Sequence, residues 1–489
     1  MKKTGIVVVT LVGMYMLITA YMLYEDLSFG NSEIRAVTPA RGKPAGFEYI
    51  EAPEGFDWRQ FEGITLDFVV ENNINANILT REIGEFINAT GININIRPMD
   101  YCTFIEKMSI DFISRTAKYE LIYVDPYQTL NRFYNRLEDL NLFNNDETLP
   151  KLAGWPGDFY QNQVDVVSYF LDRRRLYAIP FDSTTMILFY RKDIFDKYRT
   201  AFFDDKGYDW TPGTPDFTWE RYIEIAAWID ANVPDSEVRY GSGHMAQHHN
   251  SIYTDFSNVM AAYGADFFYD MNAGSLGVKN LEQIGVGSNA FIKALSVYKE
   301  VIRTASPDSL NWDWVDSAEA FKQGEIAMMP NWDEYWATIE NEALSKVAGQ
   351  VGWSVLPYGE VRSANIYGGS GIGINKDAPE EKKRAAWLFI VWFSSEHIQT
   401  LILNAPGGGN IPPRKSISEN PDIISNTTAM HMPIVLSAWS PDKAYFRPKA
   451  KNFYSIENII IDNLHKMLRY DYDPSEIAHQ MYLELSQLP

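Results

Sequence analysis

The sequence predicts an α/β protein of two domains or lobes, each built on a mainly parallel sheet flanked by helices. The chain has 489 residues, whereas a single hydrophobic core stops growing at roughly 250–300 residues. Apolar strand patterns alternate with amphipathic helix patterns after residue 63, which is typical of parallel strands joined by helices. The composition, with 46% hydrophobic and 22% charged residues, is that of a globular protein.

The first unit follows the order strand, helix, strand, helix, strand. Leu79, Ile83 and Phe86 form one helical stripe, and Gly91 ends that helix. Isoleucines then alternate with polar residues, which is a strand pattern. Such an order produces a parallel sheet with right-handed connections. The predicted elements are strands over 64–70, 92–97 and 121–124 and helices over 75–90 and 101–118.

Polar side chains directly follow two of these strands. Glu71, Asn72 and Asn73 come after the first strand, and Asp125 comes after the third. Ligands of parallel sheets bind beyond the carboxyl ends of the strands, so these positions are candidate ligand contacts. Polar capping of loops and helix starts is the alternative interpretation of each position.

Residues 176–198 are the most informative stretch of the chain. An apolar run is followed by the polar residues 182–185 and then by a strand pattern over 186–190. Asp193 predicts the N-cap of the next helix. Asp182 and the hydroxyls beside it, held between two buried strands, predict a place where a small molecule is hydrogen-bonded. A solvated turn between strands is the alternative.

The rest of the chain is mainly helical, with short strands between helices. Thr218 and Asp377 directly precede apolar periodic segments, which predicts two helix N-caps. Trp332 follows a buried strand, which predicts a place at a sheet edge with one face open. Glycines over 366–374 favour a strand that a ligand or a second backbone approaches closely. The predicted helices begin after 218 and cover 289–303, 318–324 and 379–396, the strands cover 326–329, 351–356 and 366–374, and 241–268 is not assigned.

Charge and motifs exclude several functions. The net charge of −21 argues against nucleic acid, whose phosphates require clustered lysine and arginine. The only cysteine, Cys102, excludes an internal disulfide, a cysteine-based zinc site and a lipid-modified N-terminal cysteine. The sequence contains no phosphate-binding loop and no G-x-S-x-G motif. We therefore expect no catalytic residue and no cofactor.

Three histidines form the one cluster with the spacing of a metal site. His244 and His248 are one helical turn apart, and His249 follows. The glutamate of the H-E-x-x-H motif is absent, since Met245 occupies its position, and no third ligand is apparent. We expect no metal here, and the role of the three histidines stays open.

The N-terminus predicts export. Lys2 and Lys3 precede an uncharged run over 5–24, and acidic residues follow it. The run is close to the ~20 residues that span a bilayer, and the charges around it place the rest of the chain outside the cytoplasm. We expect residues 1–24 to be an uncleaved signal anchor and residues 25–62 a tether, with a cleaved signal peptide as the alternative. The protein would lie in the periplasm or on the extracytoplasmic face of the cell membrane.

Four segments, in the same order along the chain, resemble the extracellular (periplasmic) solute-binding proteins of sugar ABC transporters. The resemblance implies two α/β lobes joined by hinge crossings near 178–183, 366–371 and 411–414, which close on a ligand in the cleft. The N-terminal lobe would comprise 63–180 and 372–412, and the C-terminal lobe 181–371 and 413–489. The four segments are ITLDFVVENN with EFINATGININI, LYAIPFDSTTMILFYRKDIFDKY, FKQGEIAMMPNWDEYW, and GGSGIGINKDAPEEKKRAAWLFIVWFSS.

The resemblance also implies a ligand, partners and contacts. The chain would be a monomeric carbohydrate-binding subunit of an ABC importer, which traps a sugar by hinge closure and delivers it to permease subunits. It would be no enzyme, and Trp332 would stack on a sugar ring. The implied ligand contacts are Asn72, Asn73, Asp125, Asp182, Trp332, Gly368, Gly369 and Arg414.

Two other functions stay open from the sequence. One is a membrane-anchored carbohydrate-cleaving enzyme, which would need an acid and a base paired in space. The other is a sugar-sensing subunit that uses the same cleft to signal to a kinase or chemoreceptor.

Overall fold

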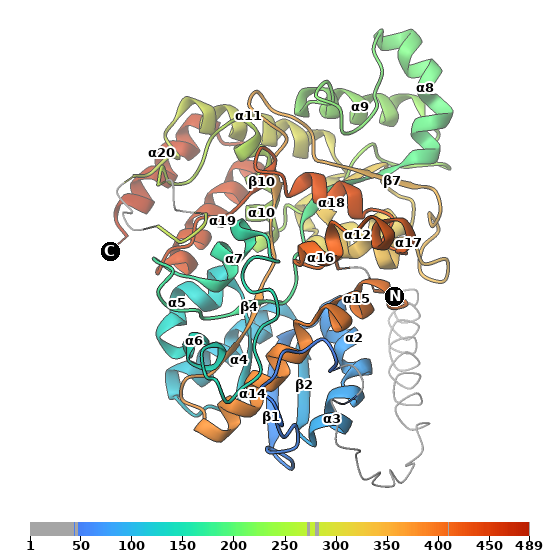
Figure 1. Ribbon diagram of the computed structural model, residues 1–489. Helices are drawn as coiled ribbons and strands as arrows, with labels where there is room; N and C mark the ends of the chain where they lie inside the picture. Colours follow the sequence, from blue (N-terminus) through green and yellow to red (C-terminus); the bar gives the residue numbers. More distant parts are fainter. Residues whose placement is uncertain (1–43, 45–46, 271–273, 279–282, 409, 489) are drawn as a thin grey trace, which may run out of the picture. The chain divides into compact units, whose positions relative to one another are not determined.

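The computed structural model describes residue 44 and residues 47–270, 274–278, 283–408 and 410–488 (Figure 1). Residues from Pro44 onward form one compact unit. The predicted anchor and the first part of the predicted tether lie outside the described residues. Among the residues that are described, no single helix is long and apolar enough to cross a membrane. One pair of consecutive helices is, when taken together, long and apolar enough for a membrane span, but the two helices are bent by 58° relative to each other.

A five-stranded sheet forms the core of the first lobe. Its strands are β1 (Thr65–Glu71), β2 (Asn93–Met99), β3 (Leu121–Val124), β4 (Ile179–Pro180) and β9 (Gly371–Ile374). They lie in the order β2-β1-β3-β9-β4. β1 is parallel to β2 and to β3, which confirms the predicted β-α-β-α-β order. β9 is antiparallel to β3 and β4, so a late segment of the chain completes the first sheet.

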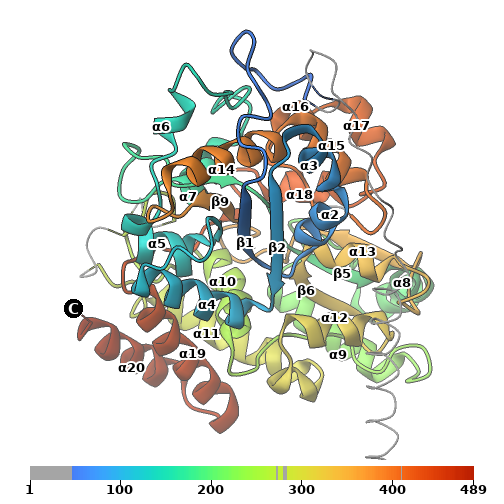
Figure 2. The same cartoon turned by 90° about the horizontal axis from the view of Figure 1, so that it is seen from below.

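Helices pack around this sheet. Figure 2 shows β1 and β2 between α4 (Tyr101–Ser114) on one side and α2 (Ile74–Glu82) and α3 (Gly84–Thr90) on the other. The single helix predicted over 75–90 is wrong in one respect, because it divides at Ile83, next to Gly84, a poor helix former. The other helices that come from the segments of this lobe are α5 (Asn131–Phe133), α6 (Asn141–Asn144), α7 (Gln161–Ser168), α14 (Glu380–Phe393) and α15 (Glu396–Asn404).

The second lobe is built on a three-stranded sheet in the order β6-β5-β7. Its strands are β5 (Met186–Arg191), β6 (Met328–Trp332) and β7 (Val351–Ser354). Both pairings are antiparallel, so the prediction of a mainly parallel sheet is wrong for this lobe. All three strands are buried apolar runs. Such a run indicates that both faces of a strand are buried, but it does not indicate whether the strand is parallel or antiparallel to its neighbours. A short parallel pair, β8 (Asn365–Ile366) with β10 (Ala444–Tyr445), lies beside this sheet.

Most of the second lobe is helical. Thr218 caps α9 as predicted, and the unassigned region 241–268 contains α10. Two predicted caps are wrong. α8 begins at Lys192, before Asp193, and α14 begins at Glu380, too late for Asp377. The remaining helices are α8 (Lys192–Lys206), α9 (Trp219–Asn232), α10 (Asn250–Ala262), α11 (Asn289–Thr304), α12 (Trp314–Lys322), α13 (Trp336–Ile339), α16 (Lys415–Ser418), α17 (Pro421–Asn426), α18 (Met432–Ala438), α19 (Phe453–Tyr470) and α20 (Pro474–Ser486).

The described end of the predicted tether is part of the folded core. Phe47, Trp58 and Phe61 are buried, and the rings of Phe47 and Trp58 meet at 4.8 Å edge to face. The backbone N–H of Lys151 donates to the carbonyl oxygen of Glu51 (2.8 Å). Residues 47–62 are therefore packed on the first lobe, and the tether prediction is wrong for this part because isolated aromatic anchors give no periodic pattern.

The chain passes between the two sheets at two glycine- and hydroxyl-rich stretches. It leaves the first sheet after Pro180 and enters the second at Met186. It returns to the first sheet at Gly371, after β8. Both stretches coincide with crossings that were predicted, and between them they bring Asp182 and Ser370 into contact. The lobe boundaries themselves stay predictions.

Candidate functional site

A cavity of about 400 Å³ lies where the two crossings meet both lobes. The ends of β1 and β3 form one wall, and the end of β6 with the turn after it forms the other. The carboxyl ends of the parallel strands β1 and β3 thus face this space, as the β-α-β order predicts. The lining includes Glu71, Asn72, Asn73, Tyr123, Asp125, Asp182, Thr184, Trp332, Glu334, Gly368, Ser370 and Arg447.

Asp182 ties the cavity wall together. Its side chain is 2% exposed. One oxygen accepts hydrogen bonds from the Tyr123 hydroxyl (2.7 Å) and from Nδ2 of Asn73 (3.2 Å). The other accepts from the backbone N–H of Ser370 (2.9 Å). Burial outweighs these bonds and raises the pKa of Asp182 to about 7. The carboxyl group joins the first sheet to both crossings and is poised between its charged and neutral forms near neutral pH.

The strand ends of the first lobe also cap their helices. Oδ1 of Asn73 accepts from the N–H of Ala76 (2.9 Å), as an N-cap does for α2. Asp125 accepts from the N–H groups of Tyr127 (2.8 Å) and Gln128 (2.6 Å). Both side chains nevertheless line the cavity. The capping interpretation and the ligand-contact interpretation are therefore compatible at these positions.

Arg447 is the one arginine among the described residues that lines the cavity. Its side chain is buried, and its guanidinium carbon lies 3.9 Å from the centre of the Tyr127 ring. Among the residues that the structure describes, its Nε has no hydrogen-bond partner and no carboxylate forms an ion pair with the guanidinium. Burial lowers the pKa of Arg447, but the nearby Tyr127 and Asp125 raise it by more than burial lowers it. The guanidinium therefore stays charged.

The second lobe contributes an aromatic face and a carboxylate. Trp332 ends β6, is 8% exposed and lines the cavity. The ring also packs on the crossing, since a Cβ added to Gly368 would lie 2.6 Å from its Cζ3 atom. Glu334 follows in a 3-10 turn (Asp333–Tyr335). Trp336, four residues on, is buried at the start of α13.

The cavity is acidic. Burial, together with the charges of Glu334 and Asp182, raises the pKa of Glu71 well above its usual range. Burial, together with the charges of Asp182 and Asp333, raises the pKa of Glu334 to about 8. No ion pair with a basic side chain of the described residues compensates Glu71, Asp125, Asp182 or Glu334. These groups can bind hydroxyl groups, or a positive charge, without first breaking a salt bridge.

The structure brings most of the predicted contacts together. Asn72, Asn73, Asp125, Asp182, Trp332 and Gly368 line the cavity. Gly369 adjoins it, with its Cα facing the Tyr367 hydroxyl and the carbonyl oxygen of Asp182. Arg414 lies elsewhere. Its guanidinium pairs with Asp158 and donates to the carbonyl oxygens of Ser394 (2.6 Å) and Ala153 (2.9 Å), which occupies its donors.

Sequence reasoning missed three lining residues with strong polar character. Glu334 follows Trp332 by two residues, so the position of that tryptophan carried a usable signal. Tyr123 is the third residue of a buried strand, and only the pairing with Asp182 reveals its role. Arg447 lies in no motif, and no sequence pattern identifies it.

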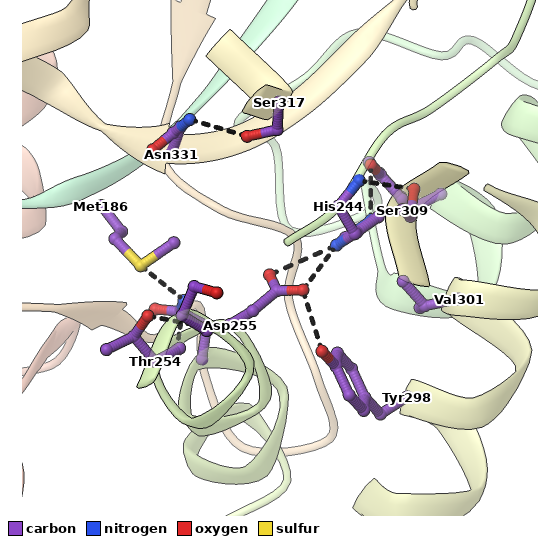
Figure 3. A network of polar contacts seen from close by, with 12 residues as sticks. Met186, His244, Thr254, Asp255, Tyr298, Val301, Ser309, Ser317 and Asn331 are labelled. Atoms are coloured by element: carbon purple, nitrogen blue, oxygen red, sulfur yellow. Dashed lines mark hydrogen bonds and ion pairs between the residues drawn. The ribbon is translucent and has the colours of Figure 1, made fainter. Parts of the chain in front are cut away.

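The three histidines have different surroundings, and only His244 belongs to the second-lobe core. Figure 3 shows His244 and Tyr298 converging on Asp255 of α10. Nδ1 of His244 lies 2.9 Å from one Asp255 oxygen, and the Tyr298 hydroxyl donates to the same oxygen (3.1 Å). His248 is exposed and lies 2.7 Å from a carboxylate oxygen of Asp462. Within the described ranges, no group of three or more His, Cys, Asp and Glu side chains is arranged to hold a metal ion.

Comparisons with known proteins give consistent results. A family model described as "Bacterial extracellular solute-binding protein" matches residues 74–400. A probable amino-acid ABC transporter periplasmic-binding protein of Sinorhizobium fredii is 22% identical over 399 residues, which is 81% of this chain and 83% of the relative.

Solved structures of similar fold cover almost the same span. An ABC transporter solute-binding protein of Agrobacterium radiobacter K84, in complex with ribitol, superposes with a TM-score of 0.72 at 25% identity and covers 88% of this chain and 100% of its own. Maltose-bound MalE3 of T. maritima superposes with a TM-score of 0.72 at 22% identity and covers 87% of this chain and 99% of its own.

Proposed function

The chain belongs to the bacterial extracellular solute-binding proteins, and from that premise we propose that it binds a carbohydrate in the cavity between its lobes and delivers it to an ABC permease. It has the two-lobe fold of this family, which confirms the fold predicted from the sequence. Members of the family act outside the cytoplasm, so the chain functions on the extracytoplasmic side.

The observation that carries the proposal is the chemistry of the cavity. Carboxylates, amides and hydroxyls line it from both lobes, and the Trp332 ring is part of the lining. Sugar hydroxyls need several acceptors and donors within one small volume, and sugar C–H faces pack well on an aromatic ring. The similar structures with bound ribitol and maltose support a polyol or sugar as the ligand class.

We assign ligand contacts to the predicted residues that reach this space. Asn72 and Asp182 would form hydrogen bonds with the sugar hydroxyls, and Trp332 would contact one face of the sugar ring. The backbone at Gly368 would lie close to the ligand, because this position has no side chain and a side chain there would collide with Trp332. Asn73 and Asp125 would combine capping with ligand binding, and Gly369 would position the crossing.

We propose binding without turnover. The family consists of binding proteins, and the sequence contains no nucleophile motif. The rival functions, carbohydrate cleavage and sugar sensing, have no observation in their favour. We also propose that residues 5–24 anchor a monomer to the membrane, because this uncharged run has the length of a bilayer span.

A thermal-shift screen of the purified chain against sugars and polyols tests the ligand class. A ligand that binds only the native state must raise the melting temperature by mass action. We expect one class of carbohydrate to do so and to be recovered unchanged by chromatography. Steady release of a product would overturn the binding proposal, and no shift with any sugar or polyol would overturn the ligand class.

Cell fractionation tests the anchor separately. We expect the protein in the membrane pellet after a high-salt wash, with its N-terminal sequence intact. Recovery of a shortened, soluble form would show that the N-terminal run is a cleaved signal peptide.

A further inference from the structure

The cavity contains more acidic side chains than the fold itself uses. Three of its carboxylates are helix caps: Asp100 accepts from the N–H of Thr103 (3.0 Å), Asp125 caps the turn after β3, and Asp313 caps α12. Glu71 and Glu334 have only neutral hydrogen-bond partners, the Tyr123 hydroxyl for Glu71 and the backbone N–H of Ile74 at the start of α2 for Glu334. No basic side chain of the described residues pairs with either, so the fold does not compensate the charge that these two carboxylates would carry in a partly desolvated space.

These two glutamates come from opposite walls. Glu71 ends β1 in the first lobe, and Glu334 lies in the turn after β6 in the second. Each carboxylate is surrounded by further negative charge, with Asp182 between the two walls. A neutral ligand that displaces water would favour the protonated, neutral forms of both groups, because desolvation disfavours a charged carboxylate. A cation placed between them would compensate both charges at once.

Arg447 is an independent indication of a ligand. Its side chain is 5% exposed, it lines the cavity, and its Nε has no hydrogen-bond partner among the described residues. A guanidinium has five N–H donors and no acceptor, so it requires oxygen acceptors in its surroundings. Hydroxyl or carboxylate oxygens of a ligand meet that requirement. His249, the other basic residue of the lining, has a lowered pKa because it is buried, so it adds no positive charge near neutral pH.

We propose that the cognate ligand is a cationic carbohydrate, an amino sugar whose ammonium group lies between Glu71 and Glu334 while its oxygens accept hydrogen bonds from Arg447. This inference rests on the proposed function and specifies its ligand. Among the described side chains, no group of three or more is arranged to hold a metal ion, and we assign the positive charge to the ligand.

Calorimetric titration with matched ligands tests the inference. The probes are D-glucosamine, D-galactosamine and D-mannosamine, each with its N-acetyl derivative and its parent hexose, and glycine and L-lysine as ammonium compounds without a sugar. We expect at least one amino sugar to bind about tenfold or more tightly than both of its neutral counterparts, as charge-assisted hydrogen bonds are the stronger ones. Titration in two buffers of different ionisation enthalpy should show that this binding releases protons from the cavity.

Two variants and one control locate the effect. Glu71→Gln and Glu334→Gln should each reduce the preference for the amino sugar by about tenfold. Glu342→Gln, an exposed residue of the second lobe that does not line the cavity, changes the net charge equally and should leave the preference unchanged. The preference is a ratio measured within one variant, so a moderate loss of stability does not obscure it.

The outcomes separate the two proposals. Neutral sugars that bind as tightly as their amino counterparts would overturn the cationic ligand and leave the carbohydrate-binding function standing. An unchanged preference in both glutamine variants would also overturn it. Binding of the amino acids and of no carbohydrate would overturn both proposals.

Discussion

Replacing Asp182 by asparagine should change how the stability of the ligand-free protein depends on pH. The pKa of Asp182 is raised from 3.8 to about 7, chiefly by burial. The folded protein therefore keeps a proton that the unfolded chain has already released at pH 5 or 6. Stability contributed by this group then falls as pH rises from the unfolded to the folded pKa. At about 1.4 kcal/mol per pH unit, the fall amounts to roughly 4 kcal/mol.

The substitution itself has a cost that does not depend on pH. Asparagine offers one acceptor oxygen in place of two. If that oxygen keeps the hydrogen bonds from Tyr123 and Asn73, the amide NH₂ faces the N–H of Ser370, which loses its acceptor. A buried donor left unsatisfied costs about 1–3 kcal/mol. Asp182→Asn should therefore lower the free energy of unfolding by about 1–3 kcal/mol below pH 4, where the wild-type group is neutral in both the folded and the unfolded chain. At pH 5 the unfolded wild-type group has already released its proton, which offsets about 1.5 kcal/mol of that loss.

At pH 8 the sign should reverse. Wild-type Asp182 is then charged and desolvated, whereas the amide is neutral. The relief of roughly 4 kcal/mol exceeds the cost of the lost hydrogen bond, so the variant should be more stable than the wild type by about 1–3 kcal/mol. Urea unfolding of both proteins at pH 5, 6, 7 and 8 measures this difference, and the other titrating groups of the cavity cancel to first order in the comparison. A stability difference between variant and wild type that stays constant across this range would refute the reasoning.

Three further substitutions test other parts of the cleft. Gly368→Ala should lower the free energy of unfolding by about 1–3 kcal/mol and weaken sugar binding, because its Cβ would meet Trp332 at 2.6 Å, whereas Gly287→Ala, with open space around its Cβ, should do neither. Trp332→Ala should cost about 3–5 kcal/mol of stability in addition to lost affinity, measured by urea unfolding and calorimetric titration; a large affinity loss at native stability would mean that the ring serves the ligand alone. Lys449→Met should lower the free energy of unfolding by about 3 kcal/mol or more, because it leaves three buried carbonyl oxygens without a donor. The Lys449 ammonium donates to the carbonyl oxygens of Asp165 (3.0 Å), Val166 (2.7 Å) and Tyr169 (2.6 Å). An unchanged urea unfolding curve would contradict this.

Patterns within one segment predicted the elements well. Alternating isoleucines place β2, and the apolar stripe over 289–303 places α11 almost residue by residue. Strand direction in the second lobe was not predictable in this way. β5 and β6 are separated by more than a hundred residues of mainly helical chain. The direction of β6 depends on the path of that chain back to the sheet, and the sequences of the two strands do not indicate this path.

Local sequence identified cleft residues where a strand end exposes a polar group. Asn73 and Asp182 were predicted from such positions, and the fold brings them within 3.2 Å although 109 residues separate them. Arg414 was expected from the family resemblance alone. Its pairing with Asp158 shows that a basic residue near a crossing can serve the first lobe rather than the ligand.

The charge of the cleft could not be derived from sequence because the chain contains 64 acidic residues and most have other duties. Some of those duties can be inferred, since an aspartate directly before a helical pattern, such as Asp100, predicts a cap. The sequence assigns no such role to Glu71 and Glu334, and only the fold shows that both face one cavity from different lobes. Because each lobe supplies one of the two carboxyl groups, the cleft can close around a neutral molecule only with these groups largely protonated, whereas a cation favours their charged forms and attracts both lobes. The charge of the ligand would then decide how readily this cleft closes, and with it which solutes the protein presents to its permease.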